Sequence, residues 1–175
     1  HPKLNDTIPL LKKRTLELVS RLVKKAKLSG VTIALRPEYW GLFSSQDIAE
    51  MAAESEAQLA INIAHLKLAN TDVKDYLRNN SDRVVYVQLS DTALNTADEF
   101  KHKPNPAFPP DAATQVFTDV GTGEIDFQDV ISTLSQELHY EGPICFCNHQ
   151  TRDPMRAMLR NRRLINALSV NGGQQ

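Results

Sequence analysis

Apolar residues recur along this chain in two alternating patterns. In four segments they return every three or four residues, a spacing that predicts amphipathic helices. These segments cover residues 8–28, 45–56, 127–138 and 154–168, and a shorter helix is predicted over 72–78. Short, nearly continuous apolar runs predict strands at 31–35, 59–64, 84–89 and 144–147. Strand and helix therefore alternate four times, which is typical of a parallel α/β sheet covered by helices.

Local signals set several boundaries of these elements. Gly30 is expected to end the first helix, and Ser44 or Ser45 to cap the second. A long polar loop rich in proline runs from about Thr92 to Thr122. Loops of this length within a compact domain are usually functional or disordered. Its Lys101–Lys103 segment is compatible with a lid or a phosphate-binding loop, and equally with an exposed polar loop.

The composition narrows the class of protein. Hydrophobic residues make up 41% of the 175 residues, which suits one globular domain. We expect that domain to cover residues 1–168 and a disordered tail to cover 169–175. The 20 basic and 21 acidic residues nearly balance, which argues against a nucleic-acid or membrane-surface partner. Cys145 and Cys147 would point the same way on one strand and are poorly placed to bridge, so a reduced, cytoplasmic location is expected.

A layer of polar and reactive side chains is predicted near the carboxyl ends of the four strands. Because side chains alternate along a strand, Val85, Val87 and Leu89 should face the helices and Gln88 the opposite side. The same alternation on the other strands gives a set of four residues: Arg36, Asn62, Gln88 and Cys147. Sites in parallel α/β proteins form at these strand ends. Two explanations account for the layer: a ligand site, or a cluster of polar side chains that hydrogen-bond one another inside a barrel.

Four stretches in order resemble motifs of the xylose-isomerase-like TIM-barrel superfamily, which includes sugar-phosphate isomerases and epimerases, dehydratases and endonuclease IV-type repair enzymes. They are SGVTIALRPEYW, LAINIAHLKL, DRVVYVQLSD and VGTGEIDFQDVISTLSQELHYEGPICFC. The last is the most specific, with Gly121, Gly123, Asp126, Phe127, Tyr140 and Gly142 in register. The resemblance implies an α/β fold that corresponds to the last four strands of a (β/α)8 barrel.

The resemblance also implies which residues to compare with the family's metal site. The family binds a divalent metal through a Glu, an Asp, a His and a Glu at the ends of these strands, where this chain has Arg36, Asn62, Gln88 and Cys147. Hard divalent ions are held by anionic oxygen ligands, and a fixed guanidinium would repel them. We therefore expect no metal and no other cofactor.

Three further residues at the strand ends are candidates for ligand contacts. Glu38, His65 and Asp91 follow the strands directly, although each is also explained by hydrogen bonds to neighbouring backbone. The planar fork of Arg36 suits a carboxylate or phosphate. The expected ligand is a small sugar, a sugar phosphate or a carboxylate such as a hydroxy acid. No catalytic residue can be assigned.

Three functions are compatible with these features. The first is a metal-free, non-catalytic barrel domain, a pseudoenzyme, that binds such a ligand. The second is an active isomerase, epimerase or dehydratase with a rearranged site that uses His65, Glu38 or Cys147. The third is a structural or interaction module.

Four predicted strands are too few for a closed barrel. Four βα units cannot close a barrel, which needs about eight strands, so strand edges and apolar surface would stay uncovered. We expect self-association, most simply a dimer, or a missing N-terminal half. Arg152, Arg156, Arg160 and Arg163 form a basic stripe on the last helix, either as a solvated face or as a contact for an anion or partner.

Overall fold

The structure is a computed structural model that describes residues 7–94, 116–148, 151 and 153–171. Four strands form one parallel sheet in the order β1-β2-β3-β6. They are β1 (Ala34–Leu35), β2 (Gln58–Asn62), β3 (Val84–Leu89) and β6 (Ile144–Phe146). A separate antiparallel pair joins β4 (Asp91–Thr92) to β5 (Phe117–Thr118). The expected α/β fold with parallel βα units is confirmed.

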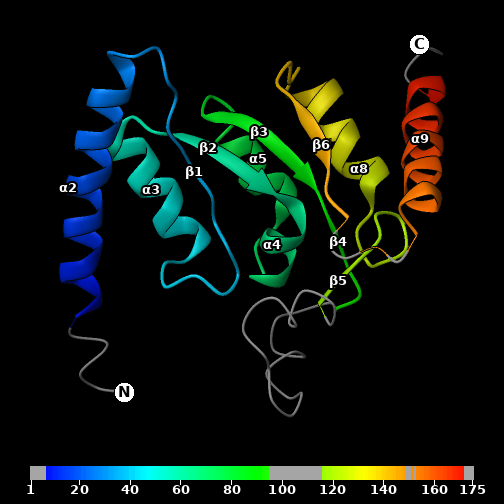
Figure 1. Cartoon of the computed structure of the whole chain (residues 1–175), viewed down its shortest axis with the longest axis horizontal. Coiled ribbons are helices and arrows are strands. Elements are labelled where there is room, and N and C mark those ends of the chain that lie inside the picture. The colour runs from blue at the N-terminus through cyan, green and yellow to red at the C-terminus, as the bar shows by residue number, and fades with distance from the viewer. Residues whose placement is uncertain (1–6, 95–115, 149–150, 152, 172–175) are drawn as a thin grey trace.

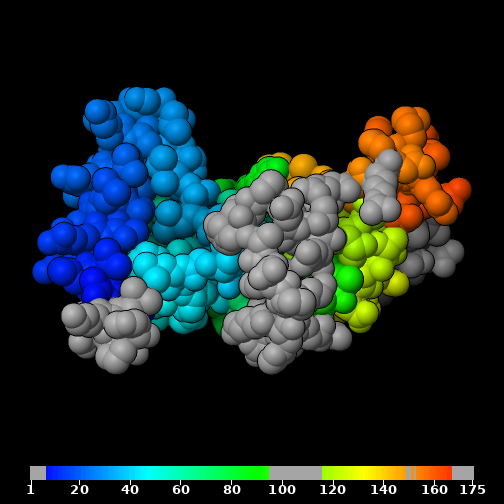
Figure 2. All heavy atoms as spheres, turned by 60° about the horizontal axis from the view of Figure 1, so that its bottom comes forward, coloured from blue at the N-terminus to red at the C-terminus, as the bar shows by residue number. Residues whose placement is uncertain are grey.

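Helices flank the sheet, and the first and last helices lie at opposite ends of the molecule (Figure 1, Figure 2). The two longest are α2 (Ile8–Lys27) and α9 (Pro154–Asn171), and between them in the chain lie α3 (Ser45–Ser55), α5 (Val73–Asn79) and α8 (Phe127–Ser132). A short α4 (Ile63–Leu68) follows β2, and a π-helical turn, η1 (Thr133–Glu137), continues α8. None of the helices in the described residues is long and apolar enough to cross a membrane.

The main core lies between the sheet and helices α3, α5 and α8. The strands contribute buried Leu59, Ile61, Val87 and Leu89, and the helices contribute residues such as Ala52. This apolar layer fixes one face of each strand. The opposite face is thereby left for the polar residues near the strand ends.

Several predicted boundaries are confirmed. The third strand covers the expected residues, and Gly30 follows the first helix with a left-handed φ of 66°. Ser44 caps α3 in a capping box, in which its hydroxyl accepts from the Asp47 amide and the Asp47 carboxylate accepts from the Ser44 amide. Residues 95–115, with Lys101–Lys103, lie outside the described residues.

Other predictions need correction. The second strand ends at Asn62 rather than at residue 64, because Ile63 already begins α4. Val85 lines a surface pocket with Leu77 of α5 and Leu134 of the helical turn after α8, but it is 36% exposed rather than buried, and the β2–β3 register shifts beside it, between Leu59 and Ala60. The first strand is limited to Ala34–Leu35, and the long loop contributes the strands β4 and β5 at its ends.

The last helix differs from its expected length. It continues to Asn171, three residues beyond the predicted end at Leu168, so residues 169–171 of the expected tail are helical. Residues 172–175 lie outside the described part of the chain. The fourth strand ends at Phe146, one residue before Cys147.

Candidate functional site

Three of the four predicted strand-end residues form one hydrogen-bonded network. The parallel register pairs Asn62 of β2 with Gln88 of β3, which brings their side chains together. Arg36, which follows β1, donates from Nη1 to Gln88 Oε1 over 3.0 Å, and Asn62 Nδ2 donates to the same oxygen over 3.3 Å. The network therefore spans the ends of three neighbouring strands.

The Arg36 guanidinium also forms an ion pair with Glu38. The Nη2–Oε1 distance is 2.6 Å, and Nε donates to the same carboxylate oxygen over 2.9 Å. The second oxygen of Glu38 accepts a hydrogen bond from the Trp40 indole. Both groups of the ion pair are about one-third exposed, so ligand molecules can reach them from solvent. The positive charge predicted at the strand ends is thus matched by a neighbouring negative one.

Asn62 is fully buried and has two tasks. Its amide nitrogen joins the strand-end network and also donates to Ser90 Oγ over 2.9 Å. Its amide oxygen accepts from the backbone of Ala64 and His65 and so caps α4. A buried amide with both ends engaged has little freedom to move, which keeps the network in place.

His65 lies in an aromatic cluster next to the ion pair. It is 1% exposed, and its Nδ1 accepts from the Tyr39 amide over 3.3 Å, which places the proton of a neutral imidazole on Nε2. The rings of Tyr39, Trp40 and Phe117 lie with centroids 4.7–5.5 Å from the imidazole. Burial raises the pKa of Tyr39 to about 12, so its hydroxyl stays protonated at neutral pH.

The three aromatic residues of this cluster were not predicted from the sequence. Tyr39 and Trp40 directly follow Arg36 and Glu38 in the RPEYW segment, which was the available signal. Phe117 is remote in the chain and reaches the cluster only through the pairing of β4 with β5. Aromatic faces beside hydrogen-bonding groups provide a surface for the apolar faces of small ligands.

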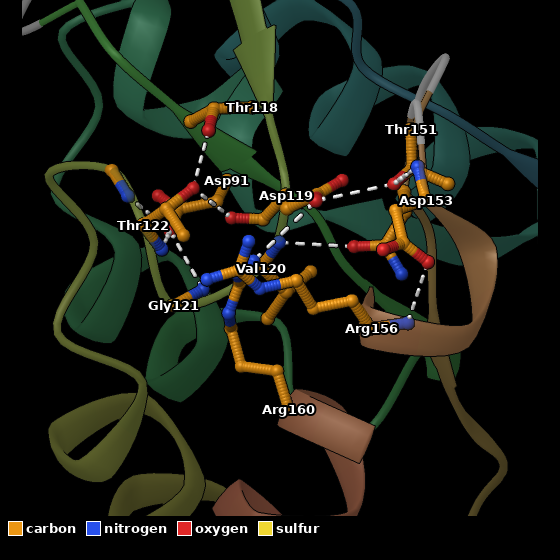
Figure 3. Close-up of polar contacts among 12 residues, drawn as sticks. Asp91, Thr118, Asp119, Val120, Gly121, Thr122, Thr151, Asp153, Arg156 and Arg160 are labelled. Atoms are coloured by element: carbon orange, nitrogen blue, oxygen red, sulfur yellow. Dashed lines mark hydrogen bonds and ion pairs between the residues drawn. The ribbon is translucent and has the colours of Figure 1, made fainter. Parts of the chain in front are cut away.

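Asp91 is turned toward backbone amides. Its Oδ2 accepts from the amides of Gly121, Thr122 and Gly123 over 2.8–3.1 Å, and its Oδ1 accepts from Thr92 and Ile125. Figure 3 shows the carboxylate facing the turn at Gly121 and Thr122. The carboxylate is fully buried. Its geometry supports a role in holding this turn, and its predicted contact with a ligand stays a prediction.

The glycines of the turn are required by the same arrangement. Gly121 has a left-handed φ of 80°, which other residues adopt only with strain. At Gly123 a Cβ would overlap the Thr92 carbonyl oxygen and the Asp91 carboxylate. The VGTG motif therefore encodes a backbone turn that closes around a carboxylate.

Cys147 extends the edge of the sheet by one hydrogen bond. Its amide donates to the Leu89 carbonyl over 2.9 Å, directly after β6. Cys145 and Cys147 are both half-buried and form no disulfide with each other, in line with the expectation.

The predicted arginine stripe divides into inward and outward residues. Arg160 points to Asp119, with 3.4 Å between Nη1 and Oδ2, and Thr151 donates to the same oxygen over 3.1 Å (Figure 3). This ion pair ties α9 to the segment that follows β5. Arg156 and Arg163 are exposed, and Arg152 lies outside the described residues.

The residues at the strand ends do not fit a divalent metal. Within the described ranges, no group of three or more His, Cys, Asp and Glu side chains is arranged to hold one. The strand-end layer offers a guanidinium, two amides and a thiol, with one carboxylate already paired to the guanidinium. A hard cation needs several anionic oxygens.

Comparisons with known proteins agree with this fold. The family model described as xylose isomerase-like TIM barrel matches residues 4–168. Among curated proteins no match was found. The 3-keto-D-glucoside 4-epimerase from E. coli superposes with a TM-score of 0.67 at 16% identity, covering 89% of this chain and 53% of that one.

Two further solved structures give the same result. A D-tagatose 3-epimerase-like protein has a TM-score of 0.67 at 16% identity, covering 93% of this chain and 57% of its own. A xylose isomerase domain protein from Planctomyces limnophilus has a TM-score of 0.65 at 16% identity, covering 89% and 51%. The chain thus spans about half the length of the solved structures that it matches.

Proposed function

The chain belongs to the xylose isomerase-like TIM barrel family, and from this premise we propose that it is a metal-free, non-catalytic barrel domain that binds a small sugar, sugar phosphate or hydroxy acid at its strand ends. The observation that carries the proposal is the hydrogen bond from Arg36 to Gln88. It places a permanent positive charge within the layer of residues that resembles the family's metal site. The protonated guanidinium opposes a divalent cation there.

The surroundings of Glu38 and His65 support the absence of catalysis. Both Glu38 oxygens already accept hydrogen bonds, from Arg36 and from Trp40. His65 is buried, and its Nδ1 accepts from the Tyr39 amide. A general base must reach the proton that it abstracts with a lone pair that is not already accepting a hydrogen bond. These hydrogen bonds favour holding a fixed geometry over moving protons.

The same groups are suited to binding a polyhydroxylated molecule. A ligand hydroxyl would replace a hydrogen bond that these groups now make with one another: Arg36 supplies donors, the Glu38 carboxylate and the Gln88 amide oxygen supply acceptors, and the Trp40 ring provides an apolar face nearby. Sugar hydroxyls both donate and accept hydrogen bonds, so they match a mixed set of this kind. An acidic group on the ligand would compete with Glu38 for the guanidinium, and each charge-assisted hydrogen bond contributes about 1.5–3 kcal/mol.

Calorimetric titration tests the proposal with three probes: D-tagatose, ribulose 5-phosphate and glycerate. At least one should bind, and Arg36→Ala should weaken its binding about tenfold or more. Arg83→Ala is the matched control, because Arg83 is a partly exposed arginine paired to Asp82 and directly precedes β3, at the opposite end of that strand.

Three results would overturn parts of the proposal. Equal losses from Arg36→Ala and Arg83→Ala would indicate diffuse electrostatics rather than a site. Absence of binding by all three probes at millimolar concentration would reject the ligand class. Turnover of D-tagatose or ribulose 5-phosphate, with or without added Mn²⁺, would reject the non-catalytic assignment.

A further inference from the structure

A surface pocket lies at the opposite end of β3 from the polar strand-end residues. It is lined by the first two residues of β3, by Leu77 of α5, by Leu134 of η1 and by residues 138–142, which precede β6. Its volume is about 380 Å³, within the range of small-molecule sites. The pocket is therefore separate from the proposed sugar site.

Three irregularities of the backbone meet at this pocket. The β2–β3 register passes from Val84 to Tyr86 and skips Val85, as in a β-bulge. Leu134 lies in the π-helical turn η1, and His139, two residues after the end of that turn, has a left-handed φ of 49°. Bulges, π-helical turns and left-handed residues other than glycine all occur often at functional sites. Their coincidence marks the pocket as a candidate for ligand binding.

His139 occupies a place that the backbone alone would give to glycine. A left-handed residue commonly ends a helix, and glycine is the usual choice because it has no Cβ to strain. The histidine instead brings an imidazole to the pocket wall. A function of the side chain would account for a histidine here.

The interior of the pocket is apolar and aromatic. Leu77 and Leu134 are buried beneath it. The Tyr140 ring lies against Gly142, where a Cβ would overlap the ring atoms. The Tyr140 hydroxyl donates to the Pro143 carbonyl over 3.3 Å, which helps to hold the ring in place. This lining suits a ligand with an apolar or aromatic body.

The rim of the pocket offers acceptors and a negative charge. Ser81, His139 and Glu141 line it, and no hydrogen bond or ion pair joins their side chains to another described residue. The two arginines next to lining residues in the chain, Arg78 and Arg83, are each paired with carboxylates of their own. The charge that a ligand meets is therefore that of Glu141, which favours a cation and repels an anion.

We propose that this pocket binds a small primary amine with an apolar or aromatic body, such as an arylalkylamine. The ammonium group has three N–H donors, which match the Glu141 carboxylate, the acceptor nitrogen of a neutral His139 imidazole and the Ser81 hydroxyl. The body of the molecule packs on the buried leucines and the Tyr140 ring. The site is independent of the proposed function at the other end of the strands.

Amide NMR titrations test the site with three matched probes: phenylethylamine, phenylethanol and phenylpropionate. The amine should shift the resonances of residues 81–85 and 138–142, which line or adjoin the pocket. Because Glu141 is exposed, its ion pair should make the amine bind only about fivefold more tightly than the alcohol. The carboxylate should bind more weakly still.

Variants separate contact with the ligand from general charge. Glu141→Gln should remove the preference for the amine over the alcohol, whereas Glu54→Gln, which removes the same charge from an exposed position on α3, should preserve it. His139→Gly should weaken the amine about threefold or more by loss of a hydrogen bond. It should not lower the melting temperature, because glycine suits the left-handed position. Arg36→Ala should leave the amine's affinity unchanged.

Four outcomes would overturn the proposal. Equal affinities for the three probes would reject the preference for a cation. Equal effects of Glu141→Gln and Glu54→Gln would attribute that preference to overall charge. Resonance shifts centred on Gln88 and lost in Arg36→Ala would assign the binding to the strand ends. The absence of shifts with every probe at millimolar concentration would reject the pocket as a binding site.

Discussion

Replacing Asp91 by asparagine tests whether its carboxylate holds the turn at Gly121–Gly123. Asparagine has nearly the same shape, but one of its two terminal groups is a donor. The carboxylate accepts three backbone hydrogen bonds at Oδ2 and two at Oδ1. Either orientation of the new amide therefore sets an NH2 group against backbone N–H groups.

The smaller loss occurs when the amide oxygen takes the Oδ2 position. The amides of Thr92 and Ile125 then lose their acceptor, and each hydrogen bond to a charged group contributes about 1.5–3 kcal/mol. The bond from Ile125 is long at 3.3 Å, which places it at the low end of that range. We expect Asp91→Asn to lower the free energy of unfolding by about 3–5 kcal/mol, a large part of the stability of an ordinary domain.

Urea unfolding followed by circular dichroism measures this loss. Asp126→Asn is the control, because Asp126 caps α8 through one oxygen and asparagine caps a helix equally well, so its effect should stay below about 0.5 kcal/mol. If the free energy of unfolding of Asp91→Asn lies within about 1 kcal/mol of the wild-type value, the carboxylate does not hold the turn and a ligand role becomes the better explanation.

Three further predictions follow from particular contacts. Gly123→Ala should lower the free energy of unfolding by at least about 2–3 kcal/mol in the same urea titration, because its Cβ would overlap backbone and carboxylate atoms. Gly30→Ala is the control: nothing lies within 4 Å of its Cβ, so only the positive φ should cost about 1–2 kcal/mol, and equal losses in the two variants would contradict this reasoning. Hydrogen bonds from Lys12 and Ser44 lower the pKa of Asp47 to about 2, below its usual 3.8. Lys12→Met should therefore reduce the free energy of unfolding at neutral pH, and the difference from wild type should narrow as pH falls from about 4 toward 2. A difference that is constant with pH would argue against the ion pair. Elemental analysis of the purified protein should find no stoichiometric divalent metal, and a chelator should leave the melting temperature unchanged, because the strand ends lack a set of anionic oxygens; about one Mn, Zn, Mg or Co per chain would contradict this.

Sequence patterns predicted the strands well where apolar continuity was unambiguous. Val84–Leu89 was bounded correctly, and the cap at Ser44 followed from its hydroxyl. The segment after Asn62 was misassigned because a short apolar run fits either a strand or a helix. The cap that Asn62 supplies to Ala64 and His65 decides between them, and this local signal is not part of the apolar pattern.

Part of the site was also predictable from the pattern of residues along the strands. Alternation along parallel strands was sufficient to bring Arg36, Asn62 and Gln88 together. Hydrogen bonds to backbone were the alternative given for Asp91 and are confirmed, but the particular partners were not predictable, because four of the five donors lie in a turn about thirty residues later in the chain. Pairing with Glu38 was also missed, since a charge two residues away can point to either side of a turn.

The double task of Asn62 bears on how such a domain could lose a metal without losing its fold. The amide oxygen caps α4, and a carboxylate oxygen at the same place would cap that helix as well. Exchanging aspartate for asparagine here would therefore keep the cap, while removing one unit of negative charge from the strand ends and adding the donor that Asn62 gives to Ser90 and Gln88. The cap of α4 is thus compatible with either residue, so this helix does not depend on whether the strand ends carry the charge that a metal would need.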